Sequence, residues 1–431
     1  MRVLVIGSGA REHALVVRLA ADAVVSEIVC APGNPGIARR ARTVPLDVAD
    51  VDAAAALAAR ERIDLTVVGP EVPLGSGIAD RFARDARLLF GPTAAAARLE
   101  TSKAFAKAFM ARHGVPTARF RVCDSADDAA ARVGEFGFPV VLKADGLAAG
   151  KGVVIADDRR AADAAIAAAM NDRVFGSAGD RLVIEEHLIG PEVSFFVVSD
   201  GERAVFVGSA QDHKRIFDED QGPNTGGMGA FAPSPLVDAA LQSRIMREIV
   251  DPVIAGMAAE GCPFRGFLYA GLMLTPEGPK VIEFNVRLGD PEAQVILPLV
   301  DAPLAPLLAA AARGSLDRSS LCRRSGKLTG VVLASRGYPA SSSSGQPIDG
   351  IDAAEAVPGV TVYHAGTAMR DGRLVTAGGR VLTVVGSGAD FADAIARAYA
   401  GVTRISFDGM QYRRDIGRKA LRIADFGSRI D

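Results

Sequence analysis

The sequence has few cysteines, no tryptophan and almost no net charge. Its 431 residues include Cys30, Cys123, Cys262 and Cys322, which form no CxxC pair and have no neighbouring histidine at zinc-ligand spacing. We therefore expect reduced thiols in the core. The 49 Lys and Arg residues against 51 Asp and Glu give a net charge of -2, which provides no broad basic surface for nucleic acid. Small molecules are the expected partners, and nucleic acid is not.

Long apolar runs are also missing. No run reaches the roughly 18 residues that a membrane-spanning helix needs. The opening stretch Arg2-Val-Leu-Val-Ile6 is too short for the apolar part of a signal peptide. We therefore predict no membrane partner and a cytoplasmic location. A monomer is expected, with a weak homodimer as the alternative.

The length and the 49% of hydrophobic residues suffice for several cores, or roughly three domains at about 150 residues each. Residues 1–100 alternate apolar strands with helical stretches, which predicts a doubly wound α/β domain. Short strands and an alanine-rich helix over residues 121–188 predict a small α+β unit that can move as a lid. It interrupts a larger unit made of residues 101–120 and 189–324. Residues 325–431 predict a C-terminal α+β domain.

A loop of glycines and alanines joins Lys143 to Lys151, directly after the apolar strand 139–142. Such a loop offers free backbone N–H groups to phosphate oxygens while the lysines supply charge. It is no P-loop, because only three residues separate Gly146 from Gly150, and Gly152 rather than Ser or Thr follows Lys151. A flexible hairpin turn is the alternative. The second lysine favours a triphosphate clamp.

The first strand is followed by Gly7-Ser-Gly-Ala-Arg-Glu12, which resembles the dinucleotide fingerprint but has Glu12 where the third glycine should stand. The second strand ends in Ala31-Pro-Gly-Asn-Pro-Gly36, with no acidic residue for a ribose. NAD is therefore not expected, whereas a helix N-terminus followed by Arg-Glu-His suits a small phosphate ester. Gly69-Pro-Glu71 falls on the same edge of the sheet. Ordinary turn chemistry is the alternative for either loop.

The predicted strand 281–285 places Glu283 and Asn285 on one face, because side chains at i and i+2 point the same way. Such hard oxygen ligands suit Mg²⁺, which binds through one or two protein groups plus nucleotide phosphates. Arg287, Asp290 and Glu292 follow within a tight turn. An exposed, salt-bridged turn is the alternative, but so dense a polar group in so apolar a chain favours a functional site.

Two further segments have the composition of binding loops. Gln211-Asp-His-Lys-Arg215 precedes the glycine-rich stretch 222–229, which can admit a substrate close to its backbone. His213 alone would more often be structural, but its charged neighbours favour anchoring of a substrate. Residues 184–192, where the lid returns to the larger unit, could hold an adenine edge, with Glu192 accepting ribose hydroxyls.

In combination, these strings resemble the phosphoribosylamine–glycine ligase family of the ATP-grasp superfamily. The resemblance runs through most of the chain and includes Gly91-Pro-Thr93, Ser102-Lys103 and the final Arg414-Asp-Ile-Gly417. It implies an ATP-grasp core over 101–120 and 189–324, with 121–188 as its lid. It also implies ATP-dependent ligation of glycine to 5-phosphoribosylamine in purine synthesis. Glycine would attack the γ-phosphoryl group, and the sugar amine would displace phosphate from the resulting glycyl phosphate.

The resemblance further implies residue roles, with one or two Mg²⁺ or Mn²⁺ ions as cofactor and ATP as co-substrate. The ATP site would comprise Lys103, Lys143, Gly150, Lys151, Gly152, Glu185, Glu186 and Glu192. The metal ligands would be Glu283 and Asn285. Catalysis would use Lys143, Arg287 on the acyl phosphate, and Asp212 and Asp290 on amines. Phosphoribosylamine would be bound by Gly9, Arg11, Glu12, His13, Asn34, Pro70, Glu71, Lys214, Asn224, Gly226 and Arg287.

Two departures and two rivals remain open. The strand 268–273 carries no carboxylate, although many ATP-grasp relatives have one there, so the number of metal ions is undecided. Ala10 replaces a glycine common in the family's first loop. Biotin-type or phosphoribosyl-aminoimidazole carboxylases would share the clamp but lack the strings at 211–215 and 222–229. The other rival, a nucleotide-binding regulatory protein without turnover, would be favoured by loss of Lys143, Glu283 or Asn285, and all three are present.

Overall fold

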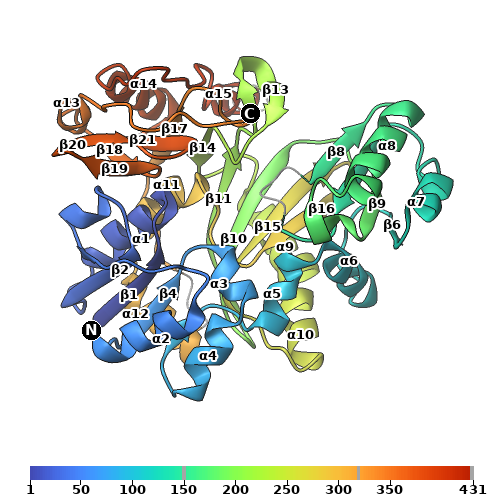
Figure 1. The fold of residues 1–431 in the computed structure, drawn as a ribbon, viewed down its shortest axis with the longest axis horizontal. Coiled ribbons are helices and arrows are strands. Elements are labelled where there is room, and N and C mark those ends of the chain that lie inside the picture. The colour runs from blue at the N-terminus through green and yellow to red at the C-terminus, as the bar shows by residue number, and fades with distance from the viewer. Residues whose placement is uncertain (148–151, 318–320, 428–431) are drawn as a thin grey trace.

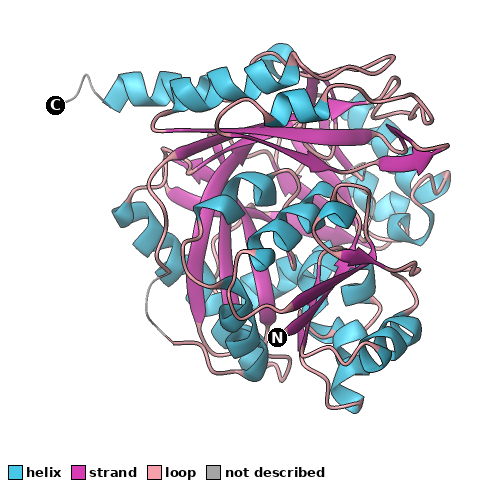
Figure 2. Cartoon of the chain, turned by 90° about the vertical axis from the view of Figure 1, so that its left-hand side faces the viewer, coloured by secondary structure: helices cyan, strands magenta, loops and turns pink. Residues whose placement is uncertain are grey.

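The computed structural model describes residues 1–147, 152–317 and 321–427 (Figure 1). None of the described helices combines the length and the apolarity that a membrane span requires. Three larger sheets organise the chain, with helices on their outer faces (Figure 2).

The first sheet is parallel and has the strand order β3-β2-β1-β4-β5. Its strands are β1 (Arg2–Gly7), β2 (Glu27–Pro32), β3 (Arg42–Thr43), β4 (Leu65–Val68) and β5 (Leu89–Phe90). Its helices are α1 (Ala10–Ala20), α2 (Val51–Arg60), α3 (Glu71–Gly75) and α4 (Ile78–Arg84). Along β1, Val3 and Val5 pack on the side of α1, whereas Leu4 and Ile6 pack on the side of α2. The predicted doubly wound α/β fold is confirmed, and the strand order reverses between β1 and β4, where such sheets bind ligands.

The second sheet has eight strands in the order β16-β15-β10-β11-β14-β17-β21-β18. Its strands are β10 (Glu192–Asp200), β11 (Ala204–Asp212), β14 (Gly229–Ala232), β15 (Arg265–Thr275), β16 (Gly278–Asn285), β17 (Lys327–Ala334), β18 (Val360–His364) and β21 (Arg380–Gly388). The C-terminal strands β17, β21 and β18 thus extend the central sheet through β14. In sequence, β17 begins about a hundred residues after β14 ends.

Helices and two short hairpins surround this sheet. The helices are α5 (Ala94–Thr101), α6 (Lys103–Arg112), α9 (Ala239–Ile245), α10 (Asp251–Ala259), α11 (Glu292–Ile296), α12 (Leu304–Arg313), α13 (Ile351–Glu355), α14 (Phe391–Val402) and α15 (Arg418–Gly427). The hairpins are β12 (Arg215–Phe217) with β13 (Gln221–Asn224), and β19 (Thr367–Arg370) with β20 (Arg373–Thr376). Ser102 caps α6 by accepting the N–H of Phe105 at 3.1 Å, so Lys103 begins this helix.

The third sheet is four-stranded, with the order β6-β9-β7-β8, and projects from the body at the right of Figure 1. Its elements are β6 (Phe120–Cys123), α7 (Ala126–Arg132), β7 (Val140–Ala144), β8 (Val153–Ala156), α8 (Arg159–Ile166) and β9 (Leu182–Glu186). It has a hydrophobic core of its own that includes Val133, Leu142 and Ile166. A separate core lets such a unit move as a body.

All four cysteines are free, but they do not all lie in the core. Cys30 and Cys123 are buried, Cys262 is partly exposed and Cys322 is exposed. The expectation of core thiols is therefore wrong for Cys322, because the connection before β17 runs over the surface there.

Candidate active site

The N-terminal loop is built around the carboxylate of Glu12. One of its oxygens accepts the N–H of Gly9 at 2.5 Å, and the other pairs with Arg11 Nε at 2.6 Å. The side chain is buried, and a Cβ at Gly69 would lie only 2.0 Å from Glu12 Oε1. Glu12 thus fills the space that glycine leaves between β1 and β4, and it ties the two loops together at the switch point of the sheet.

The neighbouring loop is held by the C-terminal segment. Asn34 donates to the carbonyls of Ser8 and His364, both at 2.8 Å, and accepts the N–H of Ile37 at 2.9 Å. His13 Nδ1 accepts the backbone N–H of His364 at 2.9 Å. Burial lowers the pKa of His13 to about 3, so the ring is neutral and its proton lies on Nε2. His13 and Asn34 therefore join the first domain to β18 as well as lining the loop.

Arg287 lies between two carboxylates from the N-terminal half of the chain. Its Nη2 is 2.9 Å from Glu100 Oε1, and its Nε is 3.3 Å from Glu71 Oε2. Glu100 also accepts the N–H of Val286 at 2.7 Å, which fixes the end of β16. Despite burial, Glu100 and Glu71 raise the pKa of Arg287, so the guanidinium is charged and held in one orientation.

Glu283 is the point at which charges from several elements converge. Burial alone would raise the pKa of Glu283, but Lys214, Lys143, Lys103 and Arg287 together lower it. Within the described residues, neither Glu283 nor Asn285 uses its side chain in a hydrogen bond or a close ion pair. Their oxygens are therefore uncommitted, which fits a divalent cation that completes its shell with phosphates. No cluster of three or more His, Cys, Asp or Glu side chains suited to a metal occurs in the described part.

Two lysines share one buried carboxylate where β7, β9 and α6 meet. Glu185 lies 3.0 Å from Lys143 Nζ through one oxygen and 2.8 Å from Lys107 Nζ through the other. Lys107 also donates to Thr117 Oγ1 at 2.7 Å, and Lys143 to the carbonyl of Ile282 at 2.9 Å. Burial lowers the pKa of Lys107 to about 8, against the pull of Glu185. Two cations against one anion leave this cluster attractive to another negative group.

Lys103 donates to the carbonyl of Gly146 at 2.8 Å, so helix α6 contacts the start of the predicted clamp. Gly150 and Lys151 lie outside the described residues. Gly152 is described, and its carbonyl accepts the N–H of Ala144 at 2.8 Å. Of the other two glutamates expected at adenosine, Glu186 pairs with Arg119 at 2.6 Å and Glu192 with Lys214 at 2.6 Å.

Asp212 ends β11 and lies beside further acidic groups. Burial and the charges of Glu292, Glu192 and Glu283 raise its pKa to about 7, although Lys214 opposes them. The neighbouring His213 has different surroundings. Its ring is buried, and the centre of the ring lies 5.9 Å from that of Phe231. The sequence treated the two residues as one charged cluster, whereas the structure gives them different surroundings.

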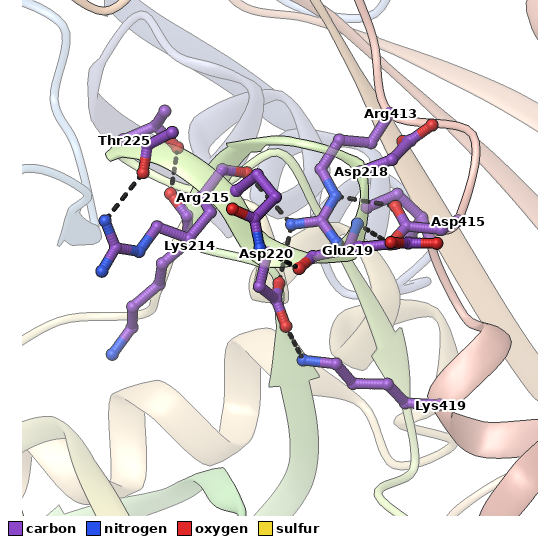
Figure 3. A network of polar contacts seen from close by, with 12 residues as sticks. Lys214, Arg215, Asp218, Glu219, Asp220, Thr225, Arg413, Asp415 and Lys419 are labelled. Carbon is purple, nitrogen blue, oxygen red and sulfur yellow. Dashed lines mark hydrogen bonds and ion pairs between the residues drawn. The ribbon is translucent and has the colours of Figure 1, made fainter.

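The segment after Asp212 is held at its tip by the C-terminal residues (Figure 3). The fully buried Arg413 pairs with Asp415 and Asp220 and donates to the carbonyl of Arg215 at 3.1 Å. Lys419 reaches Asp220 at 2.6 Å. The β12–β13 hairpin, which ends at Asn224, is thereby fixed to the C-terminal residues 413–419.

The chain matches three family descriptions along its length. Residues 1–100 match the phosphoribosylglycinamide synthetase N domain, 101–293 its ATP-grasp (A) domain and 328–419 its C domain. A phosphoribosylamine–glycine ligase from Xylella fastidiosa (strain Temecula1) is 51% identical over 425 residues, which cover 98% of each chain. This chain belongs to the phosphoribosylglycinamide synthetase family.

Solved structures agree with this family. The phosphoribosylamine–glycine ligase of Thermotoga maritima superposes with a TM-score of 0.82 and 34% identity, over 96% of this chain and 100% of that one. The biotin carboxylase domain of a Hydrogenobacter thermophilus 2-oxoglutarate carboxylase reaches 0.74 at 19% identity, over 95% and 91%. The second likeness shows a shared fold alone. The ATP-grasp fold implies ATP together with a divalent metal ion.

Sequence reasoning missed several residues that the structure brings to the candidate site. Lys107 carries a weak signal, since it follows Lys103 by four residues and so shares its helix face. Glu100 and the C-terminal Arg380 carry none, because their partners are about 190 and 90 residues away in the sequence.

Proposed function

We propose that the chain is an ATP-dependent ligase that joins glycine to 5-phosphoribosylamine and releases ADP and phosphate. The main support for this reaction is the family membership, which extends over almost the whole chain. The charges of Lys103, Lys143, Lys214 and Arg287, which together lower the pKa of Glu283, support the location of the reaction around Glu283. Phosphoryl transfer depends mainly on positioning and charge stabilisation, which such a cluster provides.

We assign the divalent cation, Mg²⁺ or Mn²⁺, to Glu283 and Asn285. Their uncommitted carboxylate and amide oxygens are the hard ligands that these ions prefer. A bound ion would neutralise the phosphates as charge shifts to the leaving ADP. The lysines around Glu283 would lie beside the same phosphates, and one or two ions fit this donor set.

The triphosphate would be held by Lys103, Lys143 and the loop that reaches Lys151. Lys143 already has a fixed partner in Glu185, so ATP must compete for it or share it. The excess positive charge of the Lys107, Glu185 and Lys143 cluster favours this. Glu185, Glu186 and Glu192 would contact the adenosine, and residues 121–188 would close as a lid that keeps water from the acyl phosphate.

The glycine carboxylate would be phosphorylated beside Arg287, whose charge and orientation are set by Glu71 and Glu100. Asp212 and Asp290 would hold the two amines. The sugar amine then attacks the carbonyl carbon, and the bond from that carbon to the bridging oxygen breaks. The phosphate that leaves keeps one oxygen of the glycine carboxylate.

Phosphoribosylamine would bind at the switch point of the first sheet. Gly9, Arg11, Glu12, His13, Asn34, Pro70 and Glu71 would shape this part, and Lys214, Asn224 and Gly226 would close it from the other side. Since Glu12, His13 and Asn34 use polar atoms to hold the loops, much of the recognition would come from backbone N–H groups. The proposed working form is a monomer in the cytoplasm.

The acyl phosphate route has a direct isotopic test. With ¹⁸O in the glycine carboxylate, the complete reaction should release phosphate that carries one ¹⁸O atom per turnover. Mass spectrometry of the phosphate would show this. Phosphate free of ¹⁸O, with glycinamide ribonucleotide formed at the usual rate, would contradict an acyl phosphate.

A further inference from the structure

Arg380, the first residue of β21, inserts its guanidinium between two loops of the active site. Its Nη1 donates to the carbonyls of Gly226 and Asp290, the latter at 2.6 Å, and lies 3.4 Å from the carbonyl of Gly227. The same nitrogen is 3.5 Å from Asp290 Oδ1. One C-terminal side chain therefore joins the glycine-rich loop to the turn that carries Asp290.

The glycines of this loop make the approach possible. A Cβ at Gly226 would lie 3.1 Å from Arg380 Cζ and 3.3 Å from the hydroxyl of Tyr338, which accepts the N–H of Gly226 at 2.9 Å. A Cβ at Gly227, whose φ is +109°, would lie 2.5 Å from Pro291 Cδ. Close packing against Pro291 and a positive φ therefore require glycine at position 227, and a side chain at position 226 would press on Arg380 and Tyr338.

Asp290 faces the first domain from this position. A Cβ at Gly9 would lie 3.5 Å from Asp290 Oδ2, and Gln294 donates to Asp290 Oδ1 at 2.9 Å. Burial alone would raise the pKa of Asp290, but Arg380 and Arg11 outweigh it and lower the pKa. Asp290 thus remains an anion beside the loop that we assign to the sugar substrate.

The tip of the same segment has a separate anchor in Arg413, as Figure 3 shows. Arg413 binds the β12–β13 hairpin and Asp415, and among the described residues none of its side-chain hydrogen bonds goes to the 287–292 turn. Arg380 differs from it by contacting both loops at once. Its position suits control of the relative placement of Gly226 and Asp290.

We propose that Arg380 is a positioning residue for the second chemical step, in which the sugar amine attacks the acyl phosphate. Acting through Asp290 and the backbone of Gly226, it sets where the amine is held. It has no part in the first step, the phosphorylation of glycine at Glu283 and Arg287. This inference rests on the proposed function.

The test compares Arg380→Gln and Arg380→Lys with Arg373→Gln as a matched control. Arg373 lies in the same C-terminal region, on the exposed β19–β20 hairpin, and its ion-pair partner Asp349 is 3.6 Å away. Two rates are measured for each variant. The first is ligation with freshly generated phosphoribosylamine. The second is glycine-dependent movement of ¹⁸O from the β,γ-bridge of ATP to its non-bridging positions, without the sugar amine, which reports the first step alone.

For Arg380→Gln we expect kcat/KM for phosphoribosylamine to fall on the order of 100-fold, because misplacement of a reacting group has about this cost. Isotope exchange and the KM for ATP should stay within about twofold of wild type, a split that simple loss of structure would not give. Arg380→Lys should recover part of the loss, since it keeps the charge without the planar fork.

Gly226→Ala provides a second variant that acts on the same contact from the other side, and it should show the same split. Equal losses of exchange and ligation in folded Arg380→Gln, or unchanged ligation, would overturn the role of Arg380. Absence of glycine-dependent exchange in a wild-type enzyme that still ligates would overturn the separation of the two steps on which this inference rests. Absence of ligation in the wild-type enzyme would instead overturn the proposed function.

Discussion

At the scale of single residues, Glu283 matters because the charges of four cationic side chains lower its pKa, while its oxygens make no hydrogen bond or close ion pair with the residues that the structure describes. Those cations come from α6, β7, the start of the β12–β13 segment and the end of β16. A carboxylate that only balanced charge would be expected to pair closely with one of them. The arrangement instead leaves the oxygens of Glu283 available to bind a cation.

Replacement of Glu283 by Gln should therefore lower kcat on the order of 100-fold or more, since charge stabilisation at one such position is worth roughly 3 kcal/mol. The metal concentration needed for half-maximal rate should also rise. Steady-state assays over a Mg²⁺ titration measure both. Glu277→Gln is the control, because Glu277 lies in the exposed β15–β16 turn, where it pairs with Lys280 at 2.7 Å. Wild-type kinetics in Glu283→Gln would remove Glu283 from the metal site.

His213 is a different kind of residue, buried with both ring nitrogens lacking a hydrogen-bond partner in the described part of the structure. Burial lowers its pKa from 6.5 to about 4. The stability that a neutral His213 contributes is thus complete above pH 6.5. It is lost as the pH falls towards 4, because the unfolded chain takes up a proton first.

We predict that this residue makes the fold on the order of 1 kcal/mol less stable at pH 5.5 than at pH 7.5. His213→Leu should remove that part of the pH dependence while unfolding at a similar urea concentration at pH 7.5. Urea unfolding curves at the two pH values give the comparison, and the partly exposed His187→Leu serves as the control. An unaltered pH dependence in His213→Leu would contradict the burial of a neutral ring.

At the scale of elements, the strand-to-helix loops of the first sheet show how much the sequence could predict. The period of apolar residues and the glycine turns were enough for β1, α1, β2 and β4, and for the shared face of Glu283 and Asn285. They were not enough for Arg380 or Glu100, because a side chain that meets a distant loop has no local pattern. The resemblance to the ligase family implied Glu12 as a substrate contact, but the sequence could not show that Glu12 packs against Gly69.

The packing of Glu12 leads to a prediction about Gly69. In Gly69→Ala the new methyl carbon would lie only 2.0 Å from Glu12 Oε1. This clash would force the carboxylate away from Gly9 and Arg11. We expect the free energy of unfolding to fall by about 1–3 kcal/mol, as in other overpacked sites, and the KM for phosphoribosylamine to rise. Gly134→Ala, with no atom within 4 Å of its added Cβ, should change neither. A neutral Gly69→Ala would show that Glu12 is not held there.

At the scale of the whole molecule, the C-terminal segment packs against the loops of the candidate active site. Its strands continue the central sheet, and His364, Arg380 and Arg413 each contact a loop that sequence reasoning assigned to substrate. The four-stranded unit projects on the opposite side, next to the lysines of the clamp. The candidate site thus lies where the three sheets approach one another, which fits the proposed reaction with three substrates.

The central claim is that the chain couples ATP cleavage to the joining of glycine and 5-phosphoribosylamine at one site. An omission experiment tests this claim most directly. Purified protein with ATP, Mg²⁺, glycine and freshly generated phosphoribosylamine should release ADP and glycinamide ribonucleotide in equal amounts. Omission of glycine or of the sugar amine should reduce ADP release to a background of about 1% or less, because glycine accepts the phosphoryl group and, without the sugar amine, ADP and glycyl phosphate stay bound in the closed site. Equal ADP release without glycine would contradict the account.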